Sequence, residues 1–585
     1  MKRNQGDFIK LCKILALKKK KVYFFLISLL LLGVILEGVS VGLIMPMLSI
    51  ISGDFGNQNS DLVEYVKKVF FIQNKKDMIF YSSIFLLIVF SIKTVVMILI
   101  SWLTNKFSFN FEANICEKIY SKIIEQPYLS LVDKSNSKLL QNFVIDSSIL
   151  SFNIILPIFR ILAESMVLLM LVIILFYFTF EITIILVPSM FILVVAYFFL
   201  IKNKIFFWGR QREKIDGNRI QHIQKTLDGI KEIKVSKFEN VFKKNFNTFN
   251  YNLAGYNKIQ NIFLDFPRIF LEFLAIVSFI FFIIFYLRFE SNTENLIPLI
   301  GLVIGILFKA LPSINRIIVG FQLIKFGLPV IDRIYSGVFE KSESETNYTN
   351  LNNDKIHEDF SLIEIKDLNY KYPKNNEATL ENINLRILNK DVIGIYGESG
   401  SGKTTFLNIF LGLIETQSGQ LKIDNKQISS LYRQYSGKIF YLPQNIFIFE
   451  DTIENNIALG RDHENEEENK RHLQNILELS DLTRAVEKMP NKEKTMLGTG
   501  GVSISGGQKQ KIGIARALYD DPKILILDEC TNALDKKTQD FILNSLLKIK
   551  SINLIIFVSH DLNSFRICNK VYKVTDKTIA EVPNV

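Results

Sequence analysis

A glycine-rich loop that ends in lysine and threonine carries the first chemistry that the sequence suggests. Residues 397–404 read GESGSGKT, a match to the phosphate-loop pattern G-x-x-x-x-G-K-[ST]. Glycines let backbone N–H groups crowd around phosphate oxygens, and a following helix N-terminus adds positive potential. A glycine turn that binds nothing is the alternative for the loop alone. The predicted nucleotide ligands are Gly397, Glu398, Ser399, Gly400, Ser401, Gly402, Lys403, Thr404 and Thr405.

Two later segments supply groups that suit the same ligand. The apolar stretch 524–527 ends in two acids, and we expect Asp528 to hold Mg²⁺ with Thr404. Glu529 is then placed to act as the general base that polarises an attacking water. A group of small residues between the loop and the acids lets a helix start bring its N–H groups onto a phosphate. The small residues are Ser505, Gly506 and Gly507, and Gln508 follows them.

The elements that must position these residues form a strand, a turn and a helix. The apolar run 392–396 precedes the loop, and a second apolar run, 405–410, follows it. The loop therefore lies where a buried strand turns into a helix, the context in which this pattern binds phosphate.

Together these segments resemble the nucleotide-binding domain of ATP-binding-cassette (ABC) transporters, in which the SGGQ signature is specific to the class. The resemblance implies that Tyr372 stacks on adenine, although an ordinary strand tyrosine is the alternative. It implies that Gln444 joins the Mg²⁺ site to the membrane interface and that His560 contacts the γ-phosphate. Asp535 matches the loop that communicates between the two nucleotide sites.

Three positions depart from the pattern of that family. Ile504 stands before the signature where leucine is usual, and Asn532 stands where serine is common. Thr499 replaces the usual acid in a segment that resembles the exporter loop touching the cytoplasmic helices. The last departure bears on coupling and leaves the predicted hydrolysis unaffected.

The bulk composition predicts a membrane part. The chain has 585 residues, is 49% hydrophobic and has a mean hydropathy of +0.22. Its net charge of +11 comes from Lys and Arg spread over loops beside apolar segments, which favours cytoplasmic positive charge over nucleic-acid binding. The four cysteines show no C-x-x-C spacing, so we expect neither a metal site nor a disulfide framework.

Long apolar segments predict six transmembrane helices. They run at about 22–51, 78–103, 150–178, 182–200, 263–287 and 296–320. Basic residues before the first segment place the N-terminus in the cytoplasm. The connections near 180–181 and 288–295 are short and external. The inner connections, 105–148 and 201–262, have helical periodicity and predict helices that continue into the cytoplasm.

The chain accordingly divides into three parts. We expect a transmembrane domain over 1–339, a solvated linker over 340–359 and an α/β phosphate-loop nucleotide-binding domain over 360–585. An amphipathic helix near 61–71 is predicted at the outer surface. Capping the helix bundle and handling a lipid are both open as its role.

One nucleotide-binding domain behind six crossings resembles the exporter half-transporters of the MsbA-like, type IV exporter fold. The resemblance implies a homodimer, because the family's ATP site takes the phosphate loop and acids from one copy and SGGQ from the other. It also implies an ATP-hydrolysing translocase that uses ATP and Mg²⁺. We expect a multi-pass protein of the bacterial inner membrane with a cytoplasmic nucleotide-binding domain.

Four cations inside the apolar segments point to an anionic substrate. Lys93, Arg268, Lys309 and Arg316 would cost about 2.5–3.5 kcal/mol each if they faced lipid. We therefore expect them to line a water-filled cavity that passes a pyrophosphate. As the alternative, some of them reach headgroups or pair with acids that also lie within the apolar segments. Those acids are Glu37, Glu164 and Glu272.

The membrane segments resemble PglK-type flippases of lipid-linked oligosaccharides, in the stretches 267–272 and 309–317 and in the predicted outer helix. The resemblance implies ATP-driven movement of a polyprenyl-pyrophosphate-linked oligosaccharide from the inner to the outer leaflet. The glycan would serve protein N-glycosylation or O-antigen assembly. An exporter of lipid A, peptide or drug would share every ATP-site residue and is the alternative. A non-transporting ABC ATPase would lack the six crossings.

Overall fold

The computed structural model divides into two compact units. Unit 1 comprises residues 1–126 and 131–342, and unit 2 comprises residues 127–130 and 343–585. The described residues are 9–11, 13–14, 20–43, 75–132, 145–178, 180–289, 296–339, 359–373, 375, 377–428, 431, 435, 437–461, 466–498, 501–529, 534–560 and 562–582. The predicted external helix near 61–71, almost all of the predicted linker, Thr499 and Asn532 lie outside them.

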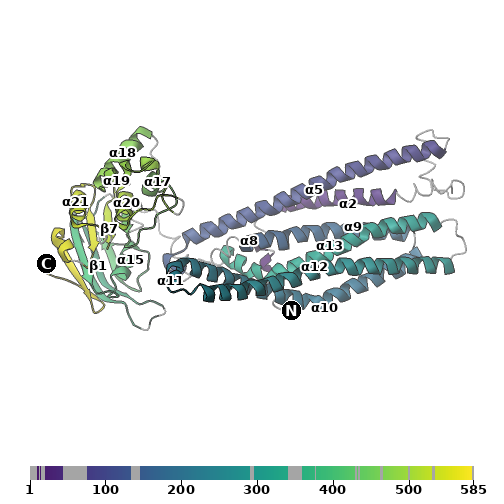
Figure 1. Ribbon diagram of the computed structural model, residues 1–585, viewed down its shortest axis with the longest axis horizontal. Helices are drawn as coiled ribbons and strands as arrows, with labels where there is room; N and C mark the ends of the chain where they lie inside the picture. Colours follow the sequence, from purple (N-terminus) through teal and green to yellow (C-terminus); the bar gives the residue numbers. More distant parts are fainter. Residues whose placement is uncertain are drawn as a thin grey trace. The chain divides into compact units, whose positions relative to one another are not determined.

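Six long helices make up most of the described part of unit 1, and they run alongside one another (Figure 1). They are α2 (Lys20–Gly42), α5 (Lys75–Glu125), α9 (Leu156–Phe178), α10 (Phe180–Asp228), α12 (Glu239–Phe289) and α13 (Leu296–Phe339). At 1.5 Å per residue, the 51 residues of α5 extend about 76 Å, far beyond the roughly 30 Å of a bilayer core. The predicted helical extensions are therefore present. Short helices α6 (Tyr128–Val132) and α11 (Ile230–Val235) occupy the two inner connections.

Hydropathy supports membrane crossing for four stretches of the described residues. They are Lys21–Gly42, Ile79–Glu125, Asp146–Tyr177 and Val303–Phe339. All four are long and strongly apolar, as expected of helices that face hydrocarbon.

Glycines let the helices of unit 1 approach closely. A side chain on Gly33 of α2 would meet Ile100 of α5 at 2.6 Å, and one on Gly38 would meet Met170 of α9 at 2.5 Å. A Cβ atom added to Gly209 of α10 would lie 2.6 Å from the backbone oxygen of Phe326 on α13. Small residues at such crossings allow the dense packing that holds helices together in lipid.

The third crossing begins irregularly. A short helix, α8 (Asp146–Ile149), leads into the π-helix η2 (Leu150–Ile155), which continues as α9. The fully buried Asp146 accepts two hydrogen bonds from Arg333 of α13, at 2.6 and 2.7 Å, and Arg333 also contacts Glu213 of α10. This pairing connects three segments of unit 1 at the start of the crossing.

The described residues of unit 2 form two β-sheets. The six-stranded sheet has the order β10 (Thr578–Glu581), β9 (Lys570–Thr575), β3 (Asp391–Gly397), β8 (Leu554–Val558), β7 (Ile524–Asp528), β6 (Ile439–Leu442). The second is antiparallel, in the order β2 (Leu380–Leu388), β1 (Leu362–Tyr370), β4 (Ser418–Ile423), β5 (Lys426–Ile428). In the large sheet β9, β3, β8, β7 and β6 are parallel, and only β10 is antiparallel.

Both faces of the large sheet are buried. Successive residues of β7 alternate between two cores: Ile524 and Ile526 belong to one, and Leu525 and Leu527 to the other. This explains the unbroken apolar runs in the sequence, because a parallel sheet is covered on both sides. The helices around these cores are α15 (Lys403–Leu411), α17 (Ile453–Ala458), α18 (Glu466–Leu479), α19 (Thr483–Glu487), α20 (Gly506–Leu518) and α21 (Lys536–Leu547), with the short turns η3 (Lys492–Lys494) and η4 (Leu562–Ile567).

Candidate functional site

Four sequence-predicted groups gather at one edge of the large sheet. The phosphate loop follows β3, the two acids follow β7, His560 follows β8, and Gln444 follows β6. These strands are neighbours and parallel, so their carboxyl ends face the same side. Ligands of open α/β sheets bind at this edge.

The phosphate loop has the backbone that only glycines adopt without strain. Gly400 and Gly402 have φ values of 83° and 106°. A side chain on Gly397 would come within 2.4 Å of the Val574 backbone oxygen. Lys403 Nζ donates to the carbonyl oxygens of Gly397 and Glu398, at 2.7 and 2.8 Å. The lysine therefore bends back over its own loop, and burial lowers its pKa, while the charges of Glu529 and Asp528 act in the opposite direction.

Asp528 is buried at the end of β7 and is held by a tyrosine. The Tyr441 hydroxyl donates to Asp528 Oδ2 at 2.8 Å. Burial raises the pKa of this carboxyl, and the Glu529 charge adds to that effect, whereas the Tyr441 hydrogen bond and the Lys403 charge oppose it. A buried carboxylate with raised pKa is stabilised by any cation that enters the site.

Glu529 lies between the loop glutamine and the histidine. Gln444 Nε2 donates to Glu529 Oε2 at 2.8 Å, and His560 Nε2 lies 2.6 Å from Glu529 Oε1. The Glu529 backbone is left-handed, with φ of 50°, and its N–H donates to the Val558 oxygen at 2.9 Å. The structure thus brings the three predicted catalytic residues together around one carboxylate.

The aromatic predicted to stack on adenine lies beside the helix that follows the loop. The hydroxyl oxygens of Tyr372 and Thr405 are 3.3 Å apart, and the Tyr372 ring meets the Tyr370 ring edge to face at 5.1 Å. Thr405 is buried, whereas Thr404 is exposed. The position of Tyr372 near the loop fits both adenine stacking and an ordinary packing role.

The signature residues and Asp535 each begin a helix. Ser505 and Gln508 form a capping box at the start of α20, with the Ser505 N–H donating to Gln508 Oε1 at 2.9 Å. Gly506 and Gly507 are the first two residues of that helix and carry no side chain beyond hydrogen. Asp535 caps α21 by accepting from the Thr538 N–H at 3.0 Å, which lowers the Asp535 pKa. The hydrogen bonds described for Ser505 and Asp535 stay within their own helix starts.

Two residues with a place in this arrangement were missed from the sequence. Tyr441 holds Asp528, as described above. Arg516 of α20 donates to the backbone oxygens of Phe447 and Asn456, at 3.1 and 2.8 Å, and so fixes the segment that follows Gln444. Tyr441 pairs in register with Ile526, two residues before Asp528. This strand register, which the structure provides, is what identifies Tyr441 as a partner of Asp528.

The residues at this edge fit a nucleoside triphosphate with Mg²⁺. Ser401 Oγ is buried and accepts or donates no hydrogen bond among the described residues. An ideal Cβ on Gly400 would meet no atom within 4 Å, so the loop has open space at that position. Asp528 and the exposed Thr404 supply oxygen donors, the type that Mg²⁺ requires.

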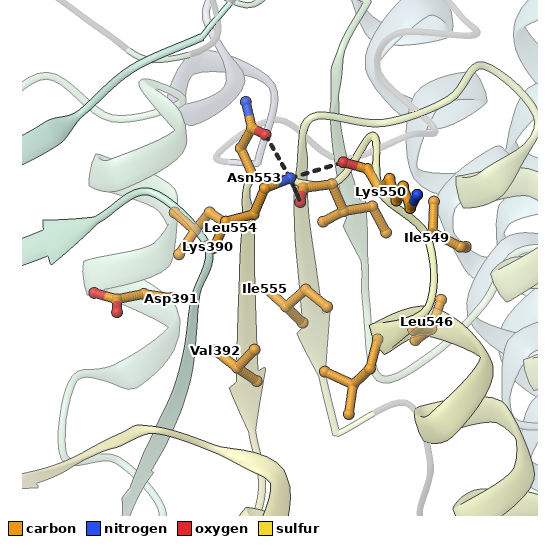
Figure 2. A pocket seen from close by; sticks show the side chains of 11 residues that line it. Lys390, Asp391, Val392, Leu546, Ile549, Lys550, Asn553, Leu554 and Ile555 are labelled. Atoms are coloured by element: carbon orange, nitrogen blue, oxygen red, sulfur yellow. Dashed lines mark hydrogen bonds between the residues drawn. The ribbon is translucent and has the colours of Figure 1, made fainter.

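A pocket of about 440 Å³ lies at the opposite ends of the same strands (Figure 2). Asp391 and Leu554, the first residues of β3 and β8, contribute to its wall. Lys390 Nζ donates to the backbone oxygens of Lys550 and Ile552, at 2.7 and 2.9 Å. This pocket contains none of the predicted site residues.

In unit 1, two of the predicted pathway cations share one carboxylate. Lys93 Nζ of α5 and Lys309 Nζ of α13 lie 3.0 and 2.6 Å from Glu37 Oε1 of α2. Lys93 Nζ also lies 3.3 Å from Ser40 Oγ. The Glu37 side chain is 1% exposed, and Lys93 and Lys309 are 15% and 25% exposed. We call these three charged residues the Glu37 cluster.

The other two predicted pathway cations have partners of their own. Arg316 of α13 donates to Glu164 of α9 at 2.6 Å, and its side chain is 46% exposed. Arg268 donates to Glu272, one turn further along α12, at 3.0 Å, with 74% of the arginine side chain exposed. Each of the four cations therefore contacts one of the acids that the sequence offered as alternative partners.

Comparison with known proteins identifies the family. The sequence profile of the family described as "ABC transporter" matches residues 380–532, and that of the "ABC transporter transmembrane region" matches residues 26–311. The chain belongs to the ABC transporters. It is an exporter-type half-transporter, in which a membrane domain precedes an ATP-binding domain whose hydrolysis of ATP drives transport.

Relatives differ in how much of the chain they match. An "ATP-dependent lipid A-core flippase" of Pectobacterium atrosepticum is 25% identical over 490 residues, 83% of this chain and 81% of that protein. Human "ATP-binding cassette sub-family B member 5" is 34% identical over 221 residues, 37% of this chain and 17% of that protein. The solved structure of a bacterial Atm1-family ABC exporter has a TM-score of 0.77 at 15% identity and covers 96% of this chain and 95% of its own. The predicted type IV exporter fold is confirmed.

Proposed function

We propose that the protein moves a polyprenyl-pyrophosphate-linked oligosaccharide from the inner to the outer leaflet of a bacterial inner membrane. The Glu37 cluster carries this proposal. Two lysines from different helices meet inside the membrane domain on a single carboxylate, which leaves a net charge of +1. Such a charge is costly in lipid and marks the path of a substrate with the opposite charge.

The depths of the cations along α13 support a path for a phosphate-bearing headgroup. Arg316 lies 20 residues after Leu296, or about 30 Å, which is the thickness of the hydrocarbon core. Lys309 is seven residues closer to Leu296 than Arg316 is, which is a distance of about 10 Å along the helix axis. With Leu296 on the outer side, Arg316 and its partner Glu164 lie at the inner headgroups. The Arg316 side chain is about half exposed there. The Glu37 cluster then lies within the hydrocarbon core, between Arg316 and the outer surface.

The residues of unit 2 are proposed to act on ATP. The phosphate loop and the signature residues would hold the triphosphate, and Thr404, Gln444 and Asp528 would hold Mg²⁺, which neutralises phosphate charge when bound. Glu529 is the proposed general base, and its carboxylate is oriented by Gln444 and His560. Tyr372 is proposed to stack on adenine and Asp535 to contact the neighbouring site.

We further propose a homodimer, since one chain carries one phosphate loop and one signature segment. The domain limits remain as proposed from the sequence, at 1–339, 340–359 and 360–585. The N-terminus and the nucleotide-binding domain are proposed to be cytoplasmic, because basic residues flank the inner ends of the apolar segments.

Export of lipid A is the second candidate function. The observation that favours it is the similarity, over 83% of this chain, to a protein named as a lipid A-core flippase. Both candidate lipids present phosphate groups to the membrane domain. They differ in the lipid, a single polyprenyl chain in one case and several acyl chains in the other.

Transport by purified protein in proteoliposomes tests the proposal. We expect ATP-dependent flipping of a polyprenyl-pyrophosphate oligosaccharide, and about a tenfold or larger loss of flipping per ATP in the Lys309→Ala/Arg316→Ala variant. The matched control, Lys244→Ala/Lys258→Ala, removes two exposed cations from α12 and should flip normally. Flipping of lipid A alone favours the second candidate, and normal flipping by the Lys309/Arg316 variant contradicts the pyrophosphate path.

A further inference from the structure

The two oxygens of Glu37 are unequally used. Oε1 contacts both Lys93 and Lys309, whereas Oε2 is buried and has no hydrogen-bond partner among the described residues. A buried carboxylate oxygen without a donor is unfavourable, because it has lost water and gained nothing in exchange. Glu37 therefore binds both lysines through the single atom Oε1, so the two ammonium groups compete for the same acceptor.

The geometry leaves donors on both lysines. Each ammonium group has three N–H donors. Lys309 is described with one partner, Glu37. Lys93 contacts Glu37 and Ser40, and its Nζ also lies 4.9 Å from the centroid of the Phe90 ring. The two ammonium groups lie on the same oxygen, so they are close enough to bind one anion together. A diphosphate, with several oxygens and more than one charge, suits such a pair better than a single carboxylate does.

We propose that Glu37 is an internal competitor for the substrate anion. It holds Lys93 and Lys309 when no substrate is present, gives them up to a phosphate-bearing headgroup, and takes them back as the headgroup leaves. The inference rests on the proposed function only in so far as the headgroup is anionic. Glu37 is a positioning residue in this account, since it acts through the two lysines and makes no contact with the substrate.

Two consequences follow for transport. A headgroup with a single charge gains little by displacing Glu37, whereas one with two or more charges gains more, so the cluster selects for multiply charged headgroups. Release is also assisted, because the carboxylate stays beside the lysines throughout. The exchange further breaks the connection that Glu37 makes between α2, α5 and α13.

Binding of a small diphosphate lipid to the full-length protein without nucleotide tests the inference. The probe is farnesyl diphosphate, and farnesol is its uncharged match. Glu37→Gln removes the competing charge and keeps the shape, so we expect it to bind farnesyl diphosphate about tenfold or more tightly than wild type. Farnesol should bind both proteins equally.

The matched control is Glu37→Gln/Lys93→Met/Lys309→Met, which is neutral at all three positions. It should lose the gain, because Glu37 acts through the lysines. If Glu37→Gln does not fold, Glu37→Asp carries the test: the shorter side chain draws the charge away from the lysines and should tighten binding by about threefold. Unchanged or weaker binding in the folded variant overturns the inference, as does an equal gain in the triple variant.

The outcome is separate from that of the proposed function. Protein that flips lipid A and not the oligosaccharide lipid contradicts the proposed substrate, and the farnesyl diphosphate comparison still decides the role of Glu37. Conversely, normal oligosaccharide flipping together with no affinity gain in Glu37→Gln leaves the proposed function standing and removes Glu37 from it.

Discussion

The charged centres of the two units are built in opposite ways. In unit 2 the acids Asp528 and Glu529 contact a tyrosine hydroxyl, a glutamine amide and a histidine ring, and Lys403 bends back onto carbonyl oxygens. In unit 1 one carboxylate, that of Glu37, contacts two lysines. The first centre has an excess of negative charge, and the second has an excess of positive charge.

The difference indicates what each centre binds. A site that holds acids on a tyrosine hydroxyl, a glutamine amide and a histidine ring gains most from a cation, which fits the proposed Mg²⁺ on a nucleotide. In the Glu37 cluster the carboxylate already occupies the place proposed for the substrate anion, so binding as proposed is an exchange. The first arrangement suits a ligand that stays through a reaction, and the second suits one that must leave.

Removing one acid of unit 2 should have the largest effect. Glu529→Gln keeps the shape of the side chain and an oxygen that can accept the hydrogen bond from Gln444. An amide cannot, however, accept a proton from water. We expect ATP hydrolysis to fall by about 10²–10⁴-fold while ATP binding persists. Phosphate release and binding of a fluorescent nucleotide measure the two quantities. Turnover near the wild-type rate contradicts the role given to Glu529.

The second prediction concerns a charged centre of unit 1 that has no proposed substrate. Arg333→Met leaves the fully buried Asp146 without its main partner, which should destabilise the protein by about 3–5 kcal/mol. Thermal unfolding in detergent measures the loss. Asp146→Asn/Arg333→Met removes both charges and should recover part of the stability. A single variant as stable as wild type would show that this pair does not support the fold.

The third prediction tests whether two chains share the centre in unit 2. Lys403→Ala damages the phosphate loop, and Ser505→Arg places a large cation at the signature. A mixed dimer of the two variants should keep one intact composite site, whereas each variant alone keeps none. ATPase activity of the variants alone and mixed measures this. Full activity in either variant by itself removes the argument for composite sites.

The smallest expected effect is on the stability of the nucleotide-free protein. Burial raises the pKa of Asp528, so this group favours the folded state at low pH, and that contribution is lost as the pH rises through the raised pKa. Asp528→Asn should therefore raise the thermal midpoint at pH 7, and the gain should shrink toward pH 4. Asp540→Asn, an exposed position on α21, is the control. A lower midpoint at pH 7 would contradict the burial effect.

The candidate nucleotide site was largely predictable from the sequence. The phosphate loop, the acids, Gln444 and His560 each follow an apolar run, and the ends of parallel strands meet at one edge. Tyr441 was not predictable, because its contact with Asp528 depends on β6 being next to β7 and on the register between them.

The membrane domain was predictable in outline and not in its contacts. Helical spacing alone allows the Arg268–Glu272 pair, which lies within one turn. The partners of Lys93, Lys309 and Arg316 lie on other helices, and long side chains reach them only at particular helix rotations. The π-helix η2 was unpredictable for a similar reason, since its residues, LSFNII, are as apolar as those of an α-helix.

The left-handed backbone of Glu529 has a consequence for how this domain can change. A side chain at φ of 50° is unfavourable for any residue except glycine and, to a lesser degree, asparagine and aspartate. Replacement by glycine would relieve that strain and would lose the carboxylate. Stability and activity therefore favour different residues at position 529, so screening variants for heat resistance alone would select against the proposed general base.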